Sequence, residues 1–197
     1  AYASICKHYR PGDRISIFGF SRGAASARLL ASKLNKYGLP KEITLHYKEM
    51  KNKSSKEKEW QFSHYKAKEE KSLKVDVNFL GIFDTVGAFG IPINLGPLNF
   101  QKINLFHDLT LSPNVQRAVH LVAIDESREP FIPTLTNLSE RIEEVWMPGV
   151  HADVGGGYED CMLGNISLEY MIGKFSRYTT DLPVTFTASL DKWTQYD

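Results

Sequence analysis

The pentapeptide Gly19-Phe20-Ser21-Arg22-Gly23 lies between two segments of different character, and no other feature constrains the fold of this chain as strongly. Residues 14–20 are short, β-branched and apolar, which is typical of a buried strand. Residues 22–36 are rich in Ala, Leu, Arg and Lys, which favour a helix. A strand that turns sharply into a helix is a building unit of a parallel sheet covered by helices. The pattern therefore predicts an α/β fold.

Strands and helices alternate along much of the remaining chain. The end of a helix is expected at residues 2–9, where the turn-forming residues 10–13 close it. Other segments predict strands at 75–83, 121–124 and 141–147, helices at 114–120 and 165–178, and loops at 88–104 and 129–139. No internal repeat or second domain is recognisable. We therefore expect one domain over residues 1–197, with a mostly parallel sheet and helices on both faces.

Residues 41–74 differ in composition from the rest of the chain. They contain ten lysines and six glutamates, with Trp60, Phe62 and Tyr65 among them. One interpretation is a solvated surface helix that a few aromatic side chains anchor. The other is a lid, or a peripheral membrane contact whose basic residues face anionic headgroups. Both interpretations make this segment an excursion from the main domain.

Composition excludes several classes of function. A formal net charge of +1 gives no reason to expect nucleic acid as a partner. No apolar run is long enough to cross a membrane, and we expect no signal peptide. Cys6 and Cys161 are isolated and lack metal-ligand spacing, so we expect unpaired buried thiols rather than a disulfide or a metal site. We expect no cofactor, and the cellular compartment stays open.

Four polar residues follow the ends of expected strands: Ser21, Asp84, Asp125 and His151. Ligands of parallel α/β sheets bind outside the carboxyl ends of the strands. In a tight strand-to-helix turn, a serine hydroxyl stands clear of the sheet, and Gly19 and Gly23 would let strand and helix crowd together around it. The N–H of Arg22 would then be the first donor to a developing oxyanion. The sequence therefore predicts Ser21 as a nucleophile.

A serine nucleophile needs a base and an acid that orients the base. Of the six histidines, only His151 follows a late strand and enters a glycine-rich loop. Asp84 and Asp125 both lie between the serine and this histidine, and we favour Asp84 because it follows the longer strand. Asp153 lies only two residues from His151, which suggests a loop-capping carboxylate. Asp125 and Asp153 stay open as alternative acids.

Several motifs together resemble one family. They are Gly19-Phe20-Ser21-Arg22-Gly23-Ala24, Phe83-Asp84-Thr85-Val86-Gly87, Val122-Ala123-Ile124-Asp125-Glu126, and the long stretch from Val145 to Tyr158 that contains Pro148-Gly149-Val150-His151-Ala152-Asp153-Val154-Gly155-Gly156-Gly157. The chain is similar to an uncharacterised α/β-hydrolase domain family that includes phospholipase effectors of bacterial type VI secretion and also occurs in fungi. The resemblance implies a catalytic domain with a Ser21, Asp84 and His151 triad and a phospholipid or other acyl-ester substrate. The compartment stays unknown, with the cytoplasm and delivery as an effector both open.

The chain differs from the family pattern at its amino end. The family opens with a strand and an Asp-Gly-Thr motif, whose loop is implied in the oxyanion hole, and no such segment precedes Ser21. We therefore expect a fragment that lacks the first strands, with an upstream segment or a partner chain completing the sheet. Two other functions stay open here: a non-catalytic module that binds a partner or lipid, and a thioesterase or peptidase with the same triad.

Overall fold

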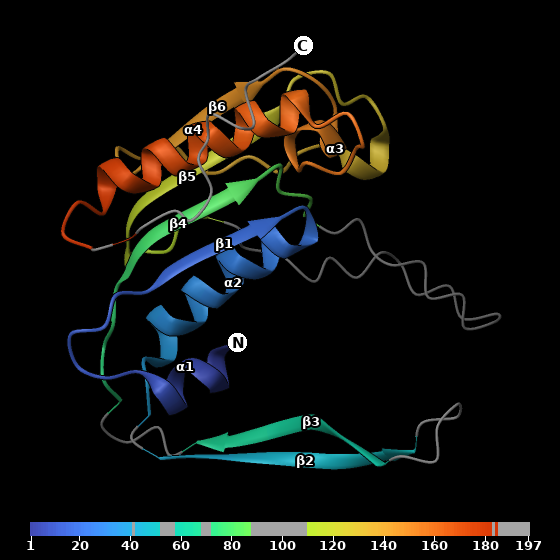
Figure 1. The fold of residues 1–197 in the computed structure, drawn as a ribbon. Helices are drawn as coiled ribbons and strands as arrows, with labels where there is room; N and C mark the ends of the chain where they lie inside the picture. Colours follow the sequence, from blue (N-terminus) through green and yellow to red (C-terminus); the bar gives the residue numbers. More distant parts are fainter. Residues whose placement is uncertain (41, 52–57, 68–71, 88–109, 183, 185–197) are drawn as a thin grey trace. The chain divides into compact units, whose positions relative to one another are not determined.

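The computed structural model describes residues 1–40, 42–51, 58–67, 72–87, 110–182 and 184 (Figure 1). The predicted loop at 88–104 lies outside these residues. The described chain divides into two compact units, which are treated separately below. One contains residues 1–13 and 33–75, and the other contains residues 14–32 and 76–197.

The larger unit is built on a parallel sheet of four strands in the order β1-β4-β5-β6. The strands are β1 (Ser16–Phe20), β4 (Val77–Phe83), β5 (Val115–Ala123) and β6 (Ile142–Met147). The strands β1, β4 and β5 run parallel, so their carboxyl ends lie side by side at one end of the sheet. The registers Phe20↔Phe83 and Phe83↔Leu121 show this. The prediction of an α/β fold with a parallel sheet is confirmed.

Helices cover both faces of this sheet. A Cβ on Gly19 would meet the backbone at the start of α2 (Arg22–Tyr37), whereas a Cβ on Gly81 would meet the side chain of Met171 in α4 (Met162–Tyr178). Gly81 pairs with Phe18, the residue before Gly19, and successive side chains of a strand point to opposite faces. The helices α2 and α4 therefore lie on opposite faces of the sheet, as Figure 1 also shows.

The core beneath α4 holds the site-bearing strands in place. Phe79 of β4, Val119 and Leu121 of β5, and Met171 and Phe175 of α4 form one buried cluster. The Phe79 and Phe175 rings meet edge to face, with their centroids 5.2 Å apart, which is a favourable aromatic geometry. Burial of large side chains such as these stabilises a fold by about 1.5–3 kcal/mol each. The carboxyl ends of β4 and β5 thus rest on a close-packed support.

The prediction of a helix at 114–120 followed by a short strand at 121–124 was wrong. The structure has one long strand, β5, over Val115–Ala123. The segment pairs with β4 on one side and β6 on the other, and six of its residues from Ala118 onward are buried. A strand buried on both faces reads as a nearly continuous apolar run without alternation, so its sequence does not separate it from a helix. The short helix α3 (His151–Val154) was not predicted.

The smaller unit contains α1 (Tyr2–His8), the end of α2, and an antiparallel hairpin of β2 (Ile43–Lys51) and β3 (Lys58–Ala67). The surface helix considered for residues 41–74 is therefore wrong. Aliphatic and aromatic residues alternate with polar ones at Ile43, Leu45 and Tyr47, and again at Trp60 and Phe62. This two-residue period is that of a strand, and it outweighs the helix-forming lysines and glutamates.

The described helices are all too short or too polar to cross a bilayer. Both cysteines are free thiols, and the expectation that they are buried was wrong. Cys161 is exposed and Cys6 is half-buried, where burial raises the pKa of its thiol.

Candidate active site

Ser21 occupies the turn between β1 and α2 in a backbone conformation that serine rarely adopts. Its φ is 59°, in the left-handed region where the Cβ of an L-residue is crowded. Hydrogen bonds on both sides keep it there: its N–H donates to Phe83 O at 3.0 Å, and its carbonyl accepts from Ala24 N at 3.0 Å. Strain of this kind persists where the surrounding structure enforces it, and it concentrates at functional sites.

Gly19 permits the close approach of β1 and α2 that forms this turn. A Cβ on Gly19 would overlap the backbone carbonyl of Gly23 and the Cα of Ala24. The expectation that Gly23 is also needed for crowding was wrong, because a Cβ there would meet no atom within 4 Å among the described residues. The contact depends on the backbone of Gly23 and not on its missing side chain.

The two glycines therefore respond differently to the same substitution. We expect Gly19→Ala to destabilise the protein by about 1–3 kcal/mol, because backbone atoms cannot retreat as a flexible side chain could. The matched control Gly23→Ala should be neutral or stabilise by up to about 1 kcal/mol, since alanine is the better helix former. Urea denaturation measures both free energies of unfolding. Equal effects would contradict the assignment of the close contact to Gly19.

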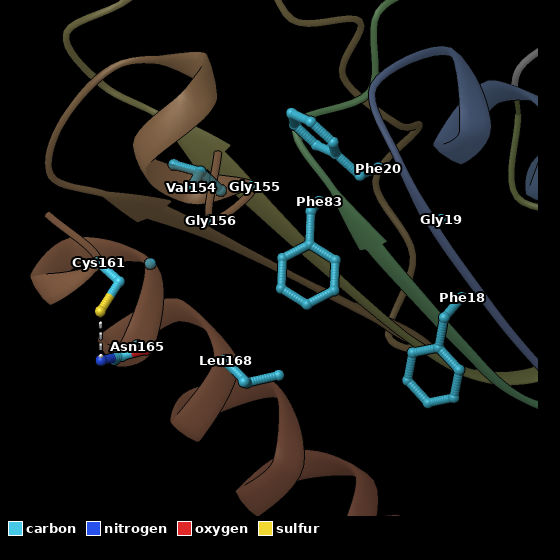
Figure 2. Close-up of a pocket in the computed structure, with 11 residues that line it drawn as sticks. Phe18, Gly19, Phe20, Phe83, Val154, Gly155, Gly156, Cys161, Asn165 and Leu168 are labelled. Carbon is cyan, nitrogen blue, oxygen red and sulfur yellow. Dashed lines mark hydrogen bonds between the residues drawn. The ribbon is translucent and has the colours of Figure 1, made fainter. Parts of the chain in front are cut away.

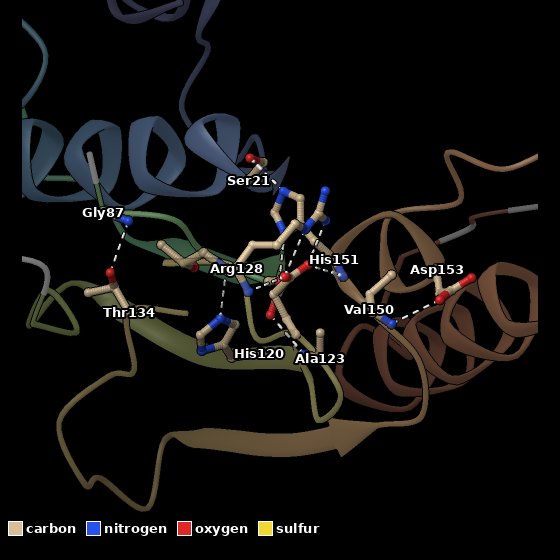
Figure 3. Close-up of polar contacts among 12 residues, drawn as sticks. Ser21, Gly87, His120, Ala123, Arg128, Thr134, Val150, His151 and Asp153 are labelled. Atoms are coloured by element: carbon tan, nitrogen blue, oxygen red, sulfur yellow. Dashed lines mark hydrogen bonds and ion pairs between the residues drawn. The ribbon is translucent and has the colours of Figure 1, made fainter. Parts of the chain in front are cut away.

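His151 is the first residue of α3, which follows β6 through the turn at Pro148–Val150. Its Nε2 lies 2.8 Å from Ser21 Oγ and its Nδ1 lies 2.6 Å from Asp84 Oδ2 (Figure 3). The imidazole packs against two aromatic rings, with centroid distances of 4.6 Å to Phe20 and 5.0 Å to Phe131. The side chain is only 6% exposed, so the ring is held in place by packing as well as by hydrogen bonds.

Asp84 follows the end of β4 and is completely buried. Its Oδ2 accepts from His151, and its Oδ1 accepts the backbone N–H of Ala123 at 2.8 Å. Its own N–H donates to Leu121 O at 2.6 Å, and its φ of 39° again lies in the left-handed region. Both carboxylate oxygens thus have donors, which is what a buried carboxylate requires.

These contacts assign the tautomer of His151. A carboxylate accepts hydrogen bonds, so the proton of the neutral imidazole lies on Nδ1, facing Asp84. Nε2 then carries a lone pair and accepts a hydrogen bond from the hydroxyl of Ser21. The arrangement can remove a proton from Ser21 Oγ and stabilise the imidazolium that results.

The beginning of α2 supplies backbone donors next to Ser21. Arg22 is the first residue of this helix, and the first N–H groups of a helix have no acceptor within it. They carry the partial positive charge of the helix dipole. Arg22 N–H thus belongs to a set of amides suited to a developing negative charge beside Ser21.

A model of the T6SS Tle1-like family, described as the catalytic domain of the type VI secretion phospholipase effector Tle1, matches residues 1–174. The chain belongs to this family. The resemblance that the sequence motifs suggested is thereby confirmed.

Individual relatives are larger than this chain. An uncharacterized protein of Saccharomyces cerevisiae, YEL023C, is 31% identical over 161 residues, which cover 71% of this chain and 22% of that protein. A solved structure of an uncharacterized Pseudomonas aeruginosa protein is 27% identical, with a TM-score of 0.50 over 87% of this chain and 24% of the other. The structure of the Tle1 effector bound to the VgrG spike of the type VI secretion system is 28% identical, with a TM-score of 0.48 over 74% and 25% of the two chains. The chain therefore spans about a quarter or less of these relatives.

In this Tle1-like chain, the two alternative acids contact backbone groups. Asp125 Oδ2 accepts from Gly149 N at 2.7 Å, and Asp125 N donates to Gly149 O at 3.1 Å. Asp153 Oδ2 accepts from Val150 N at 2.8 Å, the position of a carboxylate that caps a helix. The structure places Asp84, and neither of these two, against the imidazole of His151.

A second buried histidine supports the loop after Asp84, and sequence reasoning missed it. His120 in β5 is fully buried; its Nδ1 donates to Glu144 Oε2 at 3.0 Å, and its Nε2 accepts Thr85 N–H at 3.2 Å. Burial lowers the pKa of His120, which the hydrogen bond to Glu144 only partly opposes. The neutral ring thus fixes the residue that follows Asp84. The only sequence signal was a histidine in a long apolar run.

This buried histidine should make the stability of the protein depend on pH. Its pKa is lower in the folded state than the ordinary 6.5, so below pH 6.5 the unfolded chain binds a proton that the folded chain does not. Stability should therefore fall as pH drops below 6.5, by up to about 1.4 kcal/mol per pH unit from this residue. His120→Gln keeps one donor and one acceptor but does not titrate, so it should flatten the slope between pH 6.5 and 5.5. Unchanged slopes in urea denaturation of the two proteins would contradict this role.

An apolar pocket of about 490 Å³ adjoins Phe20 (Figure 2). Phe18, Phe20 and Phe83 line it from the sheet, and Leu168 lines it from α4, together with Val154, Gly155, Gly156, Cys161, Gly164 and Asn165. Phe20 both lines this pocket and packs on His151. A Cβ on Gly155 would overlap the Phe20 ring, so Gly155 is needed for this packing.

Proposed function

We propose that this chain is a serine hydrolase that cleaves carboxylic esters, with phospholipids as the substrate class. The observation that carries the proposal is the continuous hydrogen-bonded series from Ser21 Oγ through His151 to Asp84, with distances of 2.8 and 2.6 Å. The left-handed conformation of Ser21 between a strand and a helix supports it, as the nucleophile of an α/β-hydrolase requires such a turn. Membership of the Tle1-like family supports the choice of phospholipid.

Acylation would begin with attack of Ser21 Oγ on the ester carbonyl while His151 Nε2 takes the hydroxyl proton. The resulting oxyanion would receive the N–H of Arg22. Collapse of the tetrahedral intermediate breaks the bond to the alcohol, which leaves with the proton from Nε2, and Ser21 remains acylated. A water molecule then repeats the sequence: His151 removes its proton, the acid is released, and Ser21 regains its hydrogen.

Asp84 would act through His151 and not on the substrate. Its buried carboxylate holds the imidazole with Nδ1 protonated and stabilises the imidazolium after proton transfer. The lysine-rich residues 41–74 would bind the lipid surface, since basic residues are attracted to anionic headgroups. No step of the reaction needs a metal ion or cofactor.

Two assays test this proposal. A serine-directed fluorophosphonate should label Ser21, as identified by mass spectrometry of the labelled peptide, and the protein should release p-nitrophenol from p-nitrophenyl esters. Phospholipid vesicles should yield free fatty acid, the product of carboxylic-ester cleavage, rather than phosphorylated headgroup. Hydrolysis that survives Ser21→Ala would refute the mechanism. Absence of labelling would favour a non-catalytic binding module. Cleavage restricted to thioesters or peptides would make the protein a thioesterase or a peptidase.

A further inference from the structure

Glu126 is a carboxylate, shielded from solvent, that the proposed reaction does not use. It lies after β5, close to Asp125, and its side chain is only 1% exposed. Its Oε2 accepts the backbone N–H of His151 at 3.2 Å, so it binds the same residue as Asp84 but at the main chain. A charge that is shielded from solvent is stabilised by a partner of opposite charge.

That partner is Arg128, which contacts Glu126 three times. Arg128 Nε donates to Oε1 at 2.9 Å, Nη2 donates to Oε2 at 2.6 Å, and the Arg128 backbone N–H donates to Oε1 at 2.8 Å. Two parallel bonds from one guanidinium fix a carboxylate more precisely than a single bond. The hydrogen bond from the Arg128 side chain, acting against burial, holds the pKa of Glu126 at about 2, so the carboxylate is ionised at any ordinary pH.

Arg128 also connects Glu126 to the imidazole ring itself. The guanidinium lies over the Phe131 ring at 4.3 Å from its centroid, and Phe131 packs on the ring of His151 at 5.0 Å. Cations favour the face of an aromatic ring, and arginine stacks well there. Glu126 therefore reaches His151 by two routes, one through the backbone N–H and one through Arg128 and Phe131. Figure 3 shows Arg128 beside His151.

We propose that Glu126 is a positioning residue that fixes the backbone and ring plane of His151. Asp84 holds this ring at one atom, Nδ1, which leaves rotation about that hydrogen bond to be limited by other contacts. The second support comes from Glu126 at the main chain and from Phe131, braced by Arg128, at the ring face. The inference rests on the proposed function, because it assigns His151 the role of base.

The consequence for catalysis is a change in rate without a change in substrate binding. In the described part of the chain, the hydrogen bonds of Glu126 go to Arg128 and to the backbone of His151, not to Ser21 or Arg22, so its loss removes no group that the proposed reaction uses on the substrate. A displacement of a reacting group by about 1 Å can cost about 100-fold in rate. We therefore expect Glu126→Ala to lower kcat about 10- to 100-fold and to leave KM nearly unchanged.

The other variants separate the two routes. Glu126→Gln keeps an acceptor for His151 N–H and loses the ion pair, so its kcat should lie between those of the wild type and Glu126→Ala. Arg128→Lys should recover part of the loss seen in Arg128→Ala, because an ammonium group can still pair with Glu126. Combining Glu126→Ala with Arg128→Ala should cost less than the product of the single effects, as expected for residues that act together. Glu129→Gln, at an exposed carboxylate nearby, is the control and should match the wild type.

The experiment measures kcat and KM on a p-nitrophenyl ester, the rate of fluorophosphonate labelling at Ser21, and the downfield NMR resonance of the His151 Nδ1 proton. Support is a lower kcat and labelling rate, an unchanged KM, and faster solvent exchange of that proton in folded Glu126→Ala and Glu126→Gln. Wild-type kinetics together with an unchanged proton signal in these variants would overturn the proposal. If Glu126→Ala fails to fold, the same measurements on the isosteric Glu126→Gln decide the outcome.

The failure of this inference is distinguishable from failure of the proposed function. If the wild type neither hydrolyses esters nor labels at Ser21, the hydrolase proposal fails. The His151 proton signal still reports on positioning in that case, because it depends on Asp84 and not on a substrate. An unchanged signal then overturns the role of Glu126, and a faster exchange supports it.

Discussion

Ser21→Ala is expected to lower kcat for ester hydrolysis about 10⁶-fold, the scale of loss seen when the nucleophile of a serine hydrolase is removed. The substitution removes Oγ, the atom 2.8 Å from His151 Nε2, and leaves no other hydroxyl in that position among the hydrogen bonds of the described site. Rates of p-nitrophenol release, with burst-phase detection of the acyl-enzyme, measure the effect. KM should change little, because the reaction's binding groups stay in place.

The controls for this substitution are a second serine and a second variant of Ser21. Ser4→Ala alters an exposed hydroxyl in α1 and should retain full activity. Ser21→Gly should be as inactive as Ser21→Ala. Its free energy of unfolding should exceed those of the wild type and of Ser21→Ala by about 1–2 kcal/mol, since glycine adopts a φ of 59° without the crowding of a Cβ. Residual activity within a factor of 100 of the wild type would remove Ser21 from the mechanism.

Asp84→Asn is expected to lower kcat about 10⁴-fold while the protein stays folded. The amide oxygen can keep the hydrogen bond from Ala123 N–H, which directs the amide nitrogen toward His151 Nδ1. An amide nitrogen donates, so Nδ1 must then accept and the ring proton moves to Nε2. A protonated Nε2 cannot take the proton of Ser21. The substitution thus reverses the tautomer with little change of shape.

Asp125→Asn is the matched control for Asp84→Asn. Its carboxylate accepts only from the backbone of Gly149 in the described structure, a bond that an amide oxygen can keep. We expect less than about a tenfold change in kcat, given that no tautomer depends on it. Steady-state kinetics of the two variants, with thermal unfolding to verify folding, decide between the two carboxylates. A larger loss for Asp125→Asn would make that residue the acid.

Local sequence was sufficient for the turn at Ser21 and for the strand ends. Glycine, a polar residue and a following alanine-rich stretch encode the β1–α2 turn over a few residues, and the parallel topology then brings Ser21, Asp84 and His151 to one edge. The order of serine, acid and histidine along the chain could therefore be proposed without coordinates. The turn at Ser21 and the ends of the strands depend on a few neighbouring residues, so local composition and spacing predict them.

Long-range contacts outside the expected triad were not available from the sequence. The link between Glu126 and His151 spans 25 residues, and that between Thr85 and His120 spans 35. Neither Glu126 nor His120 differs locally from an ordinary charged or buried residue. The same limit applies to β5, whose pairing on both sides made its pattern ambiguous, and to the hairpin β2–β3, whose charges obscured its alternation.

The left-handed conformation of Ser21 has a consequence for the history of this sequence. A copy of the domain that no longer catalysed would gain stability by exchanging this serine for glycine, a change of about 1–2 kcal/mol that selection for folding alone would favour. Under the proposed function, serine at a φ of 59° lowers the stability of the fold, and use of its hydroxyl in the reaction offsets that loss. Among relatives, glycine at this position would mark lineages that keep the scaffold and have abandoned the chemistry.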